Sequence, residues 1–121
     1  MALKRLAVQI GQGTSLRSGD YTKASCRAVE DAIRHNFLSV AQAFNFPRES
    51  MIIDVEIGVQ EPDKVDKNSI AKVLPYGKVN VILTKGGIDI PIPEEPGKTV
   101  TANAAVVVYF DMEEKKWKEL F

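Results

Sequence analysis

The sequence predicts a single α+β domain over residues 1–121, with a four-stranded mixed sheet and one long and one short helix on one face. Three observations predict this class. Four segments have the alternating or continuous apolar pattern of β-strands. One long segment carries small and apolar residues at helical spacing, and it directly follows the first of these strands along the chain. A chain of this length is the usual size of one domain and buries a core without disulfides. The expected element order is β-α-β-α-β-β.

The first strand and the long helix flank a glycine-rich stretch. Residues 3–10 alternate between apolar and other side chains, which predicts a strand. The stretch GQGTSLRSGD, residues 11–20, predicts a loop that is either a plain turn or a shaped ligand-binding loop. Asp20 is the expected N-cap of the helix, because its carboxylate can accept from a first-turn amide. Helical spacing then continues as far as Phe44, with a bend near residues 35–37.

Three further strands and a short helix follow. Residues 51–60 alternate most clearly, residues 78–84 predict a third strand and residues 99–111 a fourth. A short helix is expected at 66–74, stopped by a proline. The segment KGGIDIPIPEEPGK predicts an extended arm, because its prolines bar it from a sheet interior. We expect the first two strands to be parallel, either adjacent or one strand apart, and the last two to pair antiparallel.

The face of the predicted sheet that carries no helices is mixed in character. It is too apolar for an open surface and too polar for the core of a monomer, which is typical of a subunit interface. We therefore expect a homo-oligomer with cyclic symmetry, a trimer or a multiple of one. The alternative is a solvated face with a few apolar residues. The residues expected on this face are Ala7, Gln9, Ile52, Asp54, Glu56, Asn80, Ile82, Thr84, Asn103, Ala105, Val107 and Tyr109.

Composition and charge exclude several classes of function. Sixteen basic and sixteen acidic residues give a formal net charge of zero, which argues against nucleic acid as the main partner. Cys26 is the sole cysteine and His35 the sole histidine, so we expect packing roles for both, and no metal or cofactor. No apolar run approaches the ~20 residues of a membrane span, and the N-terminal apolar stretch is too short for a signal peptide. The sequence therefore predicts a cytoplasmic protein.

From residue 11 onward the sequence resembles the "Lin" family of conserved hypothetical proteins. That family has an N-terminal signature GxGxDxHG followed by a helix of the type DxTKAAxRAxxDAIxxN. Gly11 and Gly13 match the first two glycines of the signature. The segments VEIGVQ, LPYG, GGIDIP and ANAAVVV also look like the family, so the resemblance covers nearly the whole chain. The helix pattern is matched at Asp20, Thr22, Lys23, Ala24, Arg27, Ala28, Asp31, Ala32 and Asn36.

Three positions depart from the signature. Ser15 stands where the signature has Asp, Arg17 where it has His, and Ser18 where it has the last Gly. An Asp-x-His pair can bind a metal or transfer protons, whereas a guanidinium stays protonated, so no such role is carried over to this chain. The family has no assigned activity, and the resemblance implies architecture rather than function. More loosely, the element order is similar to trimeric chorismate mutase and to YjgF-like and ring-opening amidohydrolase folds, none of whose catalytic motifs matches here.

The first candidate ligand-binding segment is the glycine stretch itself. A helix N-terminus favours anions, and Gly11 and Gly13 would let the backbone approach a ligand closely. Ser15 would add a hydrogen bond, and Arg17 would hold a carboxylate or phosphate through two hydrogen bonds. The alternative is that the glycines only turn the chain and Arg17 pairs with Asp20.

Four further candidates lie later in the chain. Lys85 beside Gly86 predicts a second anion-binding turn, or else a plain turn with an exposed lysine. Glu56, if buried at an interface, needs a cationic partner such as Arg17 or Lys85 of a neighbouring subunit, and it is also a candidate general base. Asn103 is either a structural hydrogen-bonding residue or a ligand contact.

These observations lead to one leading hypothesis and one alternative. The leading hypothesis is a cytosolic protein that binds a small anionic metabolite at a cleft between subunits, formed by residues 11–17, Lys85 and Glu56. Such a site could also catalyse an isomerisation or hydrolysis that needs electrostatic positioning rather than a covalent nucleophile. The alternative is a non-catalytic interaction or scaffolding protein, in which the loop and the proline-rich arm serve assembly.

Overall fold

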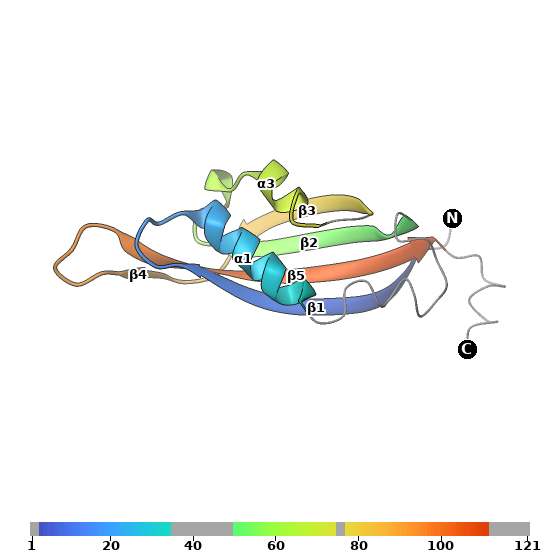
Figure 1. The fold of residues 1–121 in the computed structure, drawn as a ribbon, viewed down its shortest axis with the longest axis horizontal. Helices are drawn as coiled ribbons and strands as arrows, with labels where there is room; N and C mark the ends of the chain where they lie inside the picture. The colour runs from blue at the N-terminus through green and yellow to red at the C-terminus, as the bar shows by residue number, and fades with distance from the viewer. Residues whose placement is uncertain (1–2, 35–49, 75–76, 112–121) are drawn as a thin grey trace.

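The structure, a computed structural model, describes residues 3–34, 50–74 and 77–111 and confirms the predicted α+β class. Figure 1 shows a long, curved sheet with its helices on one side. In chain order the elements are β1 (Leu3–Ser15), α1 (Tyr21–Ile33), β2 (Ile52–Val59), the 3-10 turn η2 (Pro62–Lys64), α3 (Lys67–Ala71), β3 (Lys78–Lys85), β4 (Asp89–Pro91) and β5 (Lys98–Asp111).

The sheet has five strands rather than the four predicted. Its main order is β1-β5-β2-β3, and β4 pairs with the end of β5 that β2 does not reach. β5 is antiparallel to β1, β2 and β4, so β1 and β2 run parallel with one strand between them, as expected. The expected antiparallel pairing of the last two predicted strands is wrong, because β2 separates β3 from β5 and is parallel to β3. The predicted proline-rich arm contains β4, whose single proline, Pro91, is its last residue.

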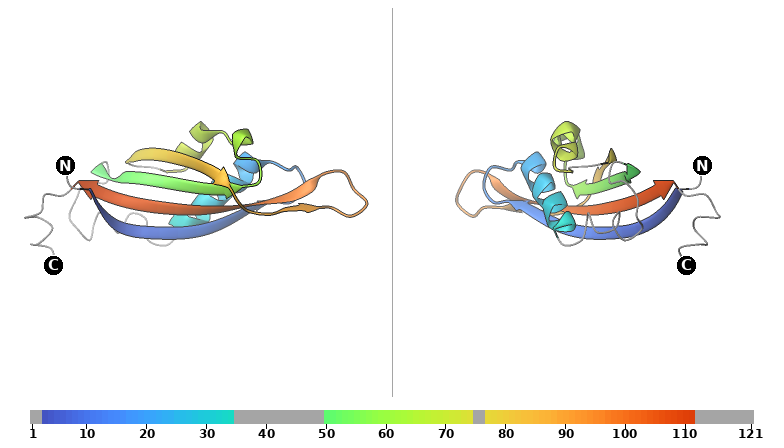
Figure 2. Two further views of the ribbon diagram at one scale, coloured as in Figure 1. Left: turned by 180° about the vertical axis from the view of Figure 1, so that it is seen from behind. Right: turned by 45° about the vertical axis from the view of Figure 1, so that its right-hand side comes forward.

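Both helices cover the same face of the sheet, as predicted. α1 packs on β1 and β5, and α3 packs beside it near β3 (Figures 1 and 2). The hydrophobic core lies between these helices and the sheet, and Cys26 packs against its margin. The side chains that fill the core are mainly aliphatic, among them Val29, Ile53, Val55, Ile57, Ile70, Val106 and Val108.

β1 is longer than predicted, and this changes the role of its glycines. The strand continues through the glycine stretch to Ser15, where a loop was expected from residue 11. Gly11 and Gly13 lie buried beneath α1. A Cβ atom on Gly11 would lie 2.2 Å from the Ala28 carbonyl oxygen, and one on Gly13 would lie 2.2 Å from that of Ala24. The glycines therefore allow the helix backbone to rest directly on the strand.

The position of these glycines also sets which side chains of β1 face away from the helices. Alternation along the strand places Val8, Ile10, Gln12 and Thr14 on the helix-free face. Gln9, predicted on that face, lies on the helix-covered side with Gly11, and the side chain of Ala7 is outside what the structure describes. Strand register confirms the helix-free position of the other predicted residues, namely Ile52, Asp54, Glu56, Asn80, Ile82, Thr84, Asn103, Ala105, Val107 and Tyr109.

Capping defines where both helices begin. The Asp20 carboxylate accepts a hydrogen bond from the Lys23 amide at 3.0 Å, which confirms the predicted N-cap of α1. Asp66 caps α3 in the same way. None of the helices in the described ranges is long and apolar enough to cross a membrane. The predicted continuation of α1 beyond residue 34, including His35, lies outside the described residues, as do residues 112–121.

Candidate functional site

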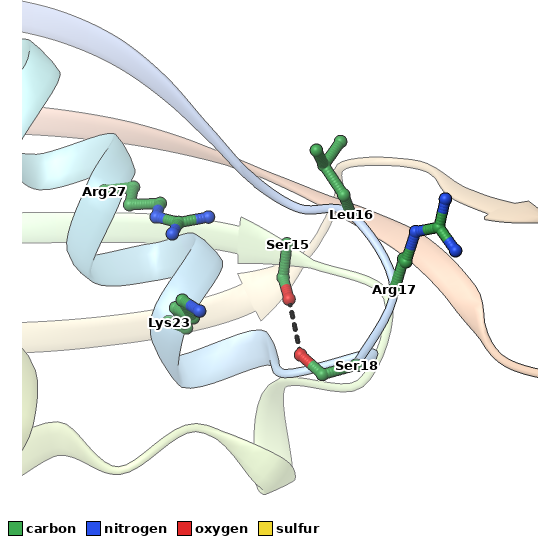
Figure 3. Close-up of a pocket in the computed structure, with 6 residues that line it drawn as sticks. All are labelled: Ser15, Leu16, Arg17, Ser18, Lys23 and Arg27. Atoms are coloured by element: carbon green, nitrogen blue, oxygen red, sulfur yellow. Dashed lines mark hydrogen bonds between the residues drawn. The ribbon is translucent and has the colours of Figure 1, made fainter.

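A basic pocket of about 340 Å³ lies between α1 and the loop that follows β1 (Figure 3). It offers two hydroxyls and three cationic side chains, and no carboxylate lines it within the described part of the chain. Its charge contrasts with a chain whose formal net charge is zero. The residues that line this basic pocket are Ser15, Leu16, Arg17, Ser18, Lys23 and Arg27.

Local hydrogen bonds fix the floor of the basic pocket. Ser15 is buried, and its hydroxyl lies 2.8 Å from the hydroxyl of Ser18. Arg27 donates to the Thr14 carbonyl oxygen at 2.7 Å, which holds its guanidinium beside the end of β1. Lys23 and Arg27 are one helical turn apart and therefore share one face of α1. The Lys23 ammonium has no ion-pair partner among the residues that the structure describes.

Arg17 belongs to the same pocket but points elsewhere. Figure 3 shows its guanidinium directed away from the two serines. It pairs with Glu95, at 3.3 Å, on the hairpin that joins β4 to β5. The alternative pairing of Arg17 with Asp20 is not observed, since Asp20 caps α1.

A second hollow, of about 220 Å³, brings together other predicted residues. It is lined by Gln12, Gly13, Thr14, Gly87, Ile88, Thr101 and Asn103, and most of these belong to the helix-free side of the sheet. The predicted site is therefore divided. Ser15 and Arg17 lie in the basic pocket, Gly13 and Asn103 line the second hollow, and Gly11 lines neither.

At the predicted turn of Lys85 and Gly86, the chain crosses over the end of β2. The Gly86 amide donates to the Val59 carbonyl oxygen at 2.9 Å, so this amide is already used within the fold. The Gln60 side chain donates to the carbonyl oxygens of Gly86 and Gly87 at 3.1 and 2.9 Å. Here the chain passes over Gly58, where an added Cβ would lie 3.3 Å from the Gly86 Cα.

Lys85 and Glu56 line neither the basic pocket nor the second hollow. Lys85 pairs in register with Val59, which is buried beneath the helices, whereas Glu56 projects from the opposite, helix-free face. Both side chains are exposed. In a single chain the sheet therefore separates these two predicted site residues.

Sequence reasoning missed a polar cluster beside the basic pocket, formed by Tyr21, Glu61, Asp89 and Lys98. The Lys98 ammonium donates to the Tyr21 hydroxyl at 2.7 Å, to Asp89 at 3.0 Å and to Glu61 at 3.2 Å. The Tyr21 hydroxyl donates to Glu61 at 2.8 Å and also contacts Asp89. These four residues, called the Tyr21 cluster below, come from four separate segments. No pattern in the sequence predicts that they meet.

Hydrogen bonds and burial shift the pKa values of the residues in the Tyr21 cluster. Burial, with the hydrogen bond to Asp89, raises the pKa of Tyr21 to about 12. Hydrogen bonds, first from Tyr21 and then from Lys64 and Lys98, lower the pKa of Glu61 to about 2. The hydrogen bond to Tyr21, followed by those to Asp89 and Glu61, raises the pKa of Lys98. At neutral pH the tyrosine is thus neutral and the lysine charged, which suits a structural junction better than a nucleophile or a base.

Comparisons with known proteins agree with the architecture. Residues 5–108 match the model of a family described as a conserved hypothetical protein, Lin0512_fam. The crystal structure of an FtsZ-like protein of unknown function from Nostoc punctiforme PCC 73102 is similar, with a TM-score of 0.81 and 32% sequence identity over 93% of this chain and 99% of that chain. No curated protein matches the chain. Within the described ranges, no group of three or more His, Cys, Asp or Glu residues is placed to hold a metal ion.

Proposed function

Because the chain belongs to the Lin0512 family of conserved hypothetical proteins, whose description assigns no activity, we propose a function from the site itself: the protein binds a small anionic ligand in the basic pocket. The lining of that pocket carries the proposal. Lys23 and Arg27 supply two positive charges near two hydroxyls, and no carboxylate lines the pocket in the described part of the chain. Arg17 also lines the pocket, but its guanidinium is directed away from the hydroxyls and pairs with Glu95. Such a concentration of one charge in a hollow attracts ligands of the opposite sign.

The three departures from the family signature support this proposal. Ser15, Arg17 and Ser18 all line the basic pocket. At two of these positions the signature has an aspartate and a histidine, whereas this chain has a hydroxyl and a permanent cation. The substitutions therefore make the pocket more attractive to an anion.

The chemistry of the lining favours binding over catalysis. Guanidinium groups stay protonated, so those of the lining do not remove a proton from a ligand. Hydroxyls need an adjacent base to act as nucleophiles. An isomerisation or hydrolysis remains a prediction from the sequence, and the lining itself supports recognition and positioning.

We also propose that copies of the chain assemble through the helix-free face. Val8 and Ile10 on β1 are 45% and 67% exposed, and Ile88 and Ile90 beside β4 are 63% and 49% exposed. Strand register places Val8, Ile10 and Ile90 on the helix-free face, and Ile88 lines the second hollow with Gln12, Thr14 and Asn103 of that face. Exposed aliphatic side chains gathered on one face are typical of an association surface, and a cyclic homo-oligomer, a trimer or a multiple of one, would cover them.

Assembly of this kind would place the second hollow between subunits, where the leading hypothesis put a ligand cleft. The rival function, an interaction or scaffolding protein without a ligand, uses the same surface. Measuring anion binding by variants of the basic pocket distinguishes the two proposed functions, because only ligand binding requires the cationic lining.

Lys23→Gln is the variant that tests anion binding. Lys23 is exposed and its ammonium makes no ion pair in the described structure, so the substitution leaves the fold intact. We expect the Kd for inorganic phosphate, measured by calorimetry at low salt, to rise about tenfold, or ~1.4 kcal/mol. Lys67→Gln removes another exposed lysine, from α3, and serves as the matched control.

Two results would contradict the proposed function. One is a wild-type chain that binds neither phosphate nor citrate at millimolar concentration. The other is an equal loss of affinity in Lys23→Gln and Lys67→Gln, which would indicate a general charge effect rather than a pocket.

A further inference from the structure

The three cations of the basic pocket are not equally available to a ligand. Arg27 is held by the neutral Thr14 carbonyl oxygen, and Lys23 has no ion-pair partner among the described residues. Among the described residues, Arg17 alone of the three is paired with a carboxylate, that of Glu95. An anion entering the pocket must therefore compete with Glu95 before it can use Arg17.

The hairpin that carries Glu95 is seated firmly against the loop that carries Arg17. Gly97, with a φ of +101°, comes so close that a Cβ there would lie 2.7 Å from the Arg17 carbonyl oxygen. The Thr99 hydroxyl donates to the Leu16 carbonyl oxygen at 2.6 Å. These two contacts with the backbone of the loop keep Glu95 near Arg17 whether or not the Arg17 and Glu95 side chains are paired.

The base of the same hairpin is fixed as well. Ser18 forms an isolated β-bridge with Lys98, and the side chain of Lys98 is held by the Tyr21 cluster. Asp89, at the other end of the hairpin, belongs to that cluster too. The hairpin and the pocket loop therefore form one unit, and Glu95 is a permanent neighbour of the basic pocket.

The pair itself is weak enough to be displaced. The side chains of Arg17 and Glu95 are 80% and 51% exposed, and exposed ion pairs contribute little to stability. Exchanging Glu95 for a ligand carboxylate gains almost nothing, because Arg17 then makes the same kind of contact that it had before. A phosphoryl dianion offers a guanidinium more charge and two oxygens in the matching geometry, so this exchange is favourable.

We propose that Arg17 is the specificity-determining residue that makes the basic pocket select ligands with a dianionic phosphoryl group over monocarboxylates, and that Glu95, the resident competitor for its guanidinium, limits this preference. This inference rests on the proposed function. Glu95 holds Arg17 out of the pocket, a phosphoryl group draws it in, and a carboxylate does not. The pocket volume of about 340 Å³ leaves room for a phosphate ester of a small metabolite rather than for phosphate alone.

The test compares Glu95→Gln with Glu94→Gln in the full chain. Affinities for inorganic phosphate at pH 8 and for acetate are measured by calorimetry at one ionic strength. Without its competitor Arg17 is open to both anions, and the dianion gains more from a free guanidinium, so Glu95→Gln should tighten phosphate binding more than acetate binding and the preference for phosphate should rise about fivefold. Glu94→Gln removes the same charge from the adjacent, exposed position and should leave the preference unchanged.

A second variant ties the effect to Arg17. In the Arg17→Gln background, Glu95→Gln should no longer change the preference. An equal preference in Glu95→Gln and Glu94→Gln, or an unchanged effect of Glu95→Gln without Arg17, would overturn this inference while leaving the proposed function intact. Failure of the wild-type chain to bind either anion would instead overturn the proposed function, and this inference with it.

Discussion

Gly13 determines how closely α1 can approach β1. The helix backbone is already at the distance that a hydrogen atom permits, because a Cβ at this position would meet the Ala24 carbonyl oxygen at 2.2 Å. The obstacle is backbone, which a rotamer change cannot move. A side chain here would have to push the first turns of α1 away from the sheet, and with them Lys23 and Arg27.

Gly13→Ala is therefore expected to destabilise the protein by ~3 kcal/mol, the upper end of the range for overpacking. Urea denaturation followed by circular dichroism measures the change. Thr14→Ala, one residue further along and exposed on the helix-free face, is the matched control and should change the free energy of unfolding by less than ~0.5 kcal/mol. Equal stability of the two variants would show that α1 does not rest on Gly13 as described.

Residue patterns singled out two of the six residues that line the basic pocket. Ser15 and Arg17 were found because hydroxyl and guanidinium groups follow the glycines directly. Gly11 and Gly13 were misassigned to a loop, since glycine serves both to turn a chain and to admit a close neighbour, and the two uses look alike in a sequence. Lys23 and Arg27 were missed, although their spacing of four residues on a predicted helix places both on one face.

At the level of elements, the Tyr21 cluster joins α1, the segment before η2, β4 and the start of β5. Tyr21 is 3% exposed, and its hydroxyl lies among Glu61, Asp89 and Lys98. Tyr21→Phe keeps the ring and removes those hydrogen bonds, which involve charged groups. We expect a loss of ~1.5–3 kcal/mol of stability, and little change for Tyr109→Phe on the helix-free face.

The dependence of the free energy of unfolding on pH tests the role of Tyr21 independently. The pKa of Tyr21 is about 12 in the folded chain against 10.0 for an ordinary tyrosine, so the unfolded chain loses this proton first as the pH rises. Stability supplied by Tyr21 is complete below pH 10 and is lost between pH 10 and 12. The Tyr21→Phe variant should show a shallower fall over that interval, and an identical fall in both proteins would contradict the assignment.

At low pH, the Tyr21 cluster is weakened by protonation of Glu61. Its pKa falls from 4.5 to about 2 on folding, so its contribution is complete above pH 4.5 and is lost as the pH drops toward 2. The cluster should therefore hold the β4–β5 hairpin against α1 across the whole neutral range.

The order of strands was harder to predict than their existence. Alternation located β2, β3 and β5 to within a residue or two, because each has one buried face. Periodicity within a strand carries no information about its neighbour, so the pairing of β3 with β2 was missed. The crossing that allows it depends on Gly58, Gly86 and the side chain of Gln60, which come together only in the folded chain.

At the level of the whole molecule, the helix-free face is close in size to one side of a standard protein interface. β1, β2, β3 and β5 contain 13, 8, 8 and 14 residues. With about 3.3 Å per residue and about 4.8 Å between strands, they span roughly 700 Å². A standard interface buries about 800 Å² per partner, so the whole of this face would be needed. The formal net charge of zero means that copies do not repel one another as a whole.

Ile10→Lys tests assembly directly. The side chain is 67% exposed, so the substitution should leave the fold stable while placing a charge at the interface. We expect the wild-type chain to be oligomeric and Ile10→Lys to be monomeric by light scattering at about 100 μM, since unpaired buried charges oppose association. Glu30→Lys on the exposed side of α1 should assemble like the wild type. A monomeric wild-type chain at this concentration would contradict the proposed assembly.

The close fit of Gly11 and Gly13 under α1 also separates the residues that maintain the fold from those that we propose contact a ligand. The glycines and the alanines above them keep the helix in place, and the residues that line the basic pocket begin only at Ser15, where the strand ends. Replacing Ser15, Arg17 and Ser18 thus exchanges the recognition chemistry and leaves the scaffold unaltered. Related chains that keep both glycines but carry aspartate and histidine in the loop should adopt this same shape and accept different molecules, so selectivity in such proteins can diverge faster than structure.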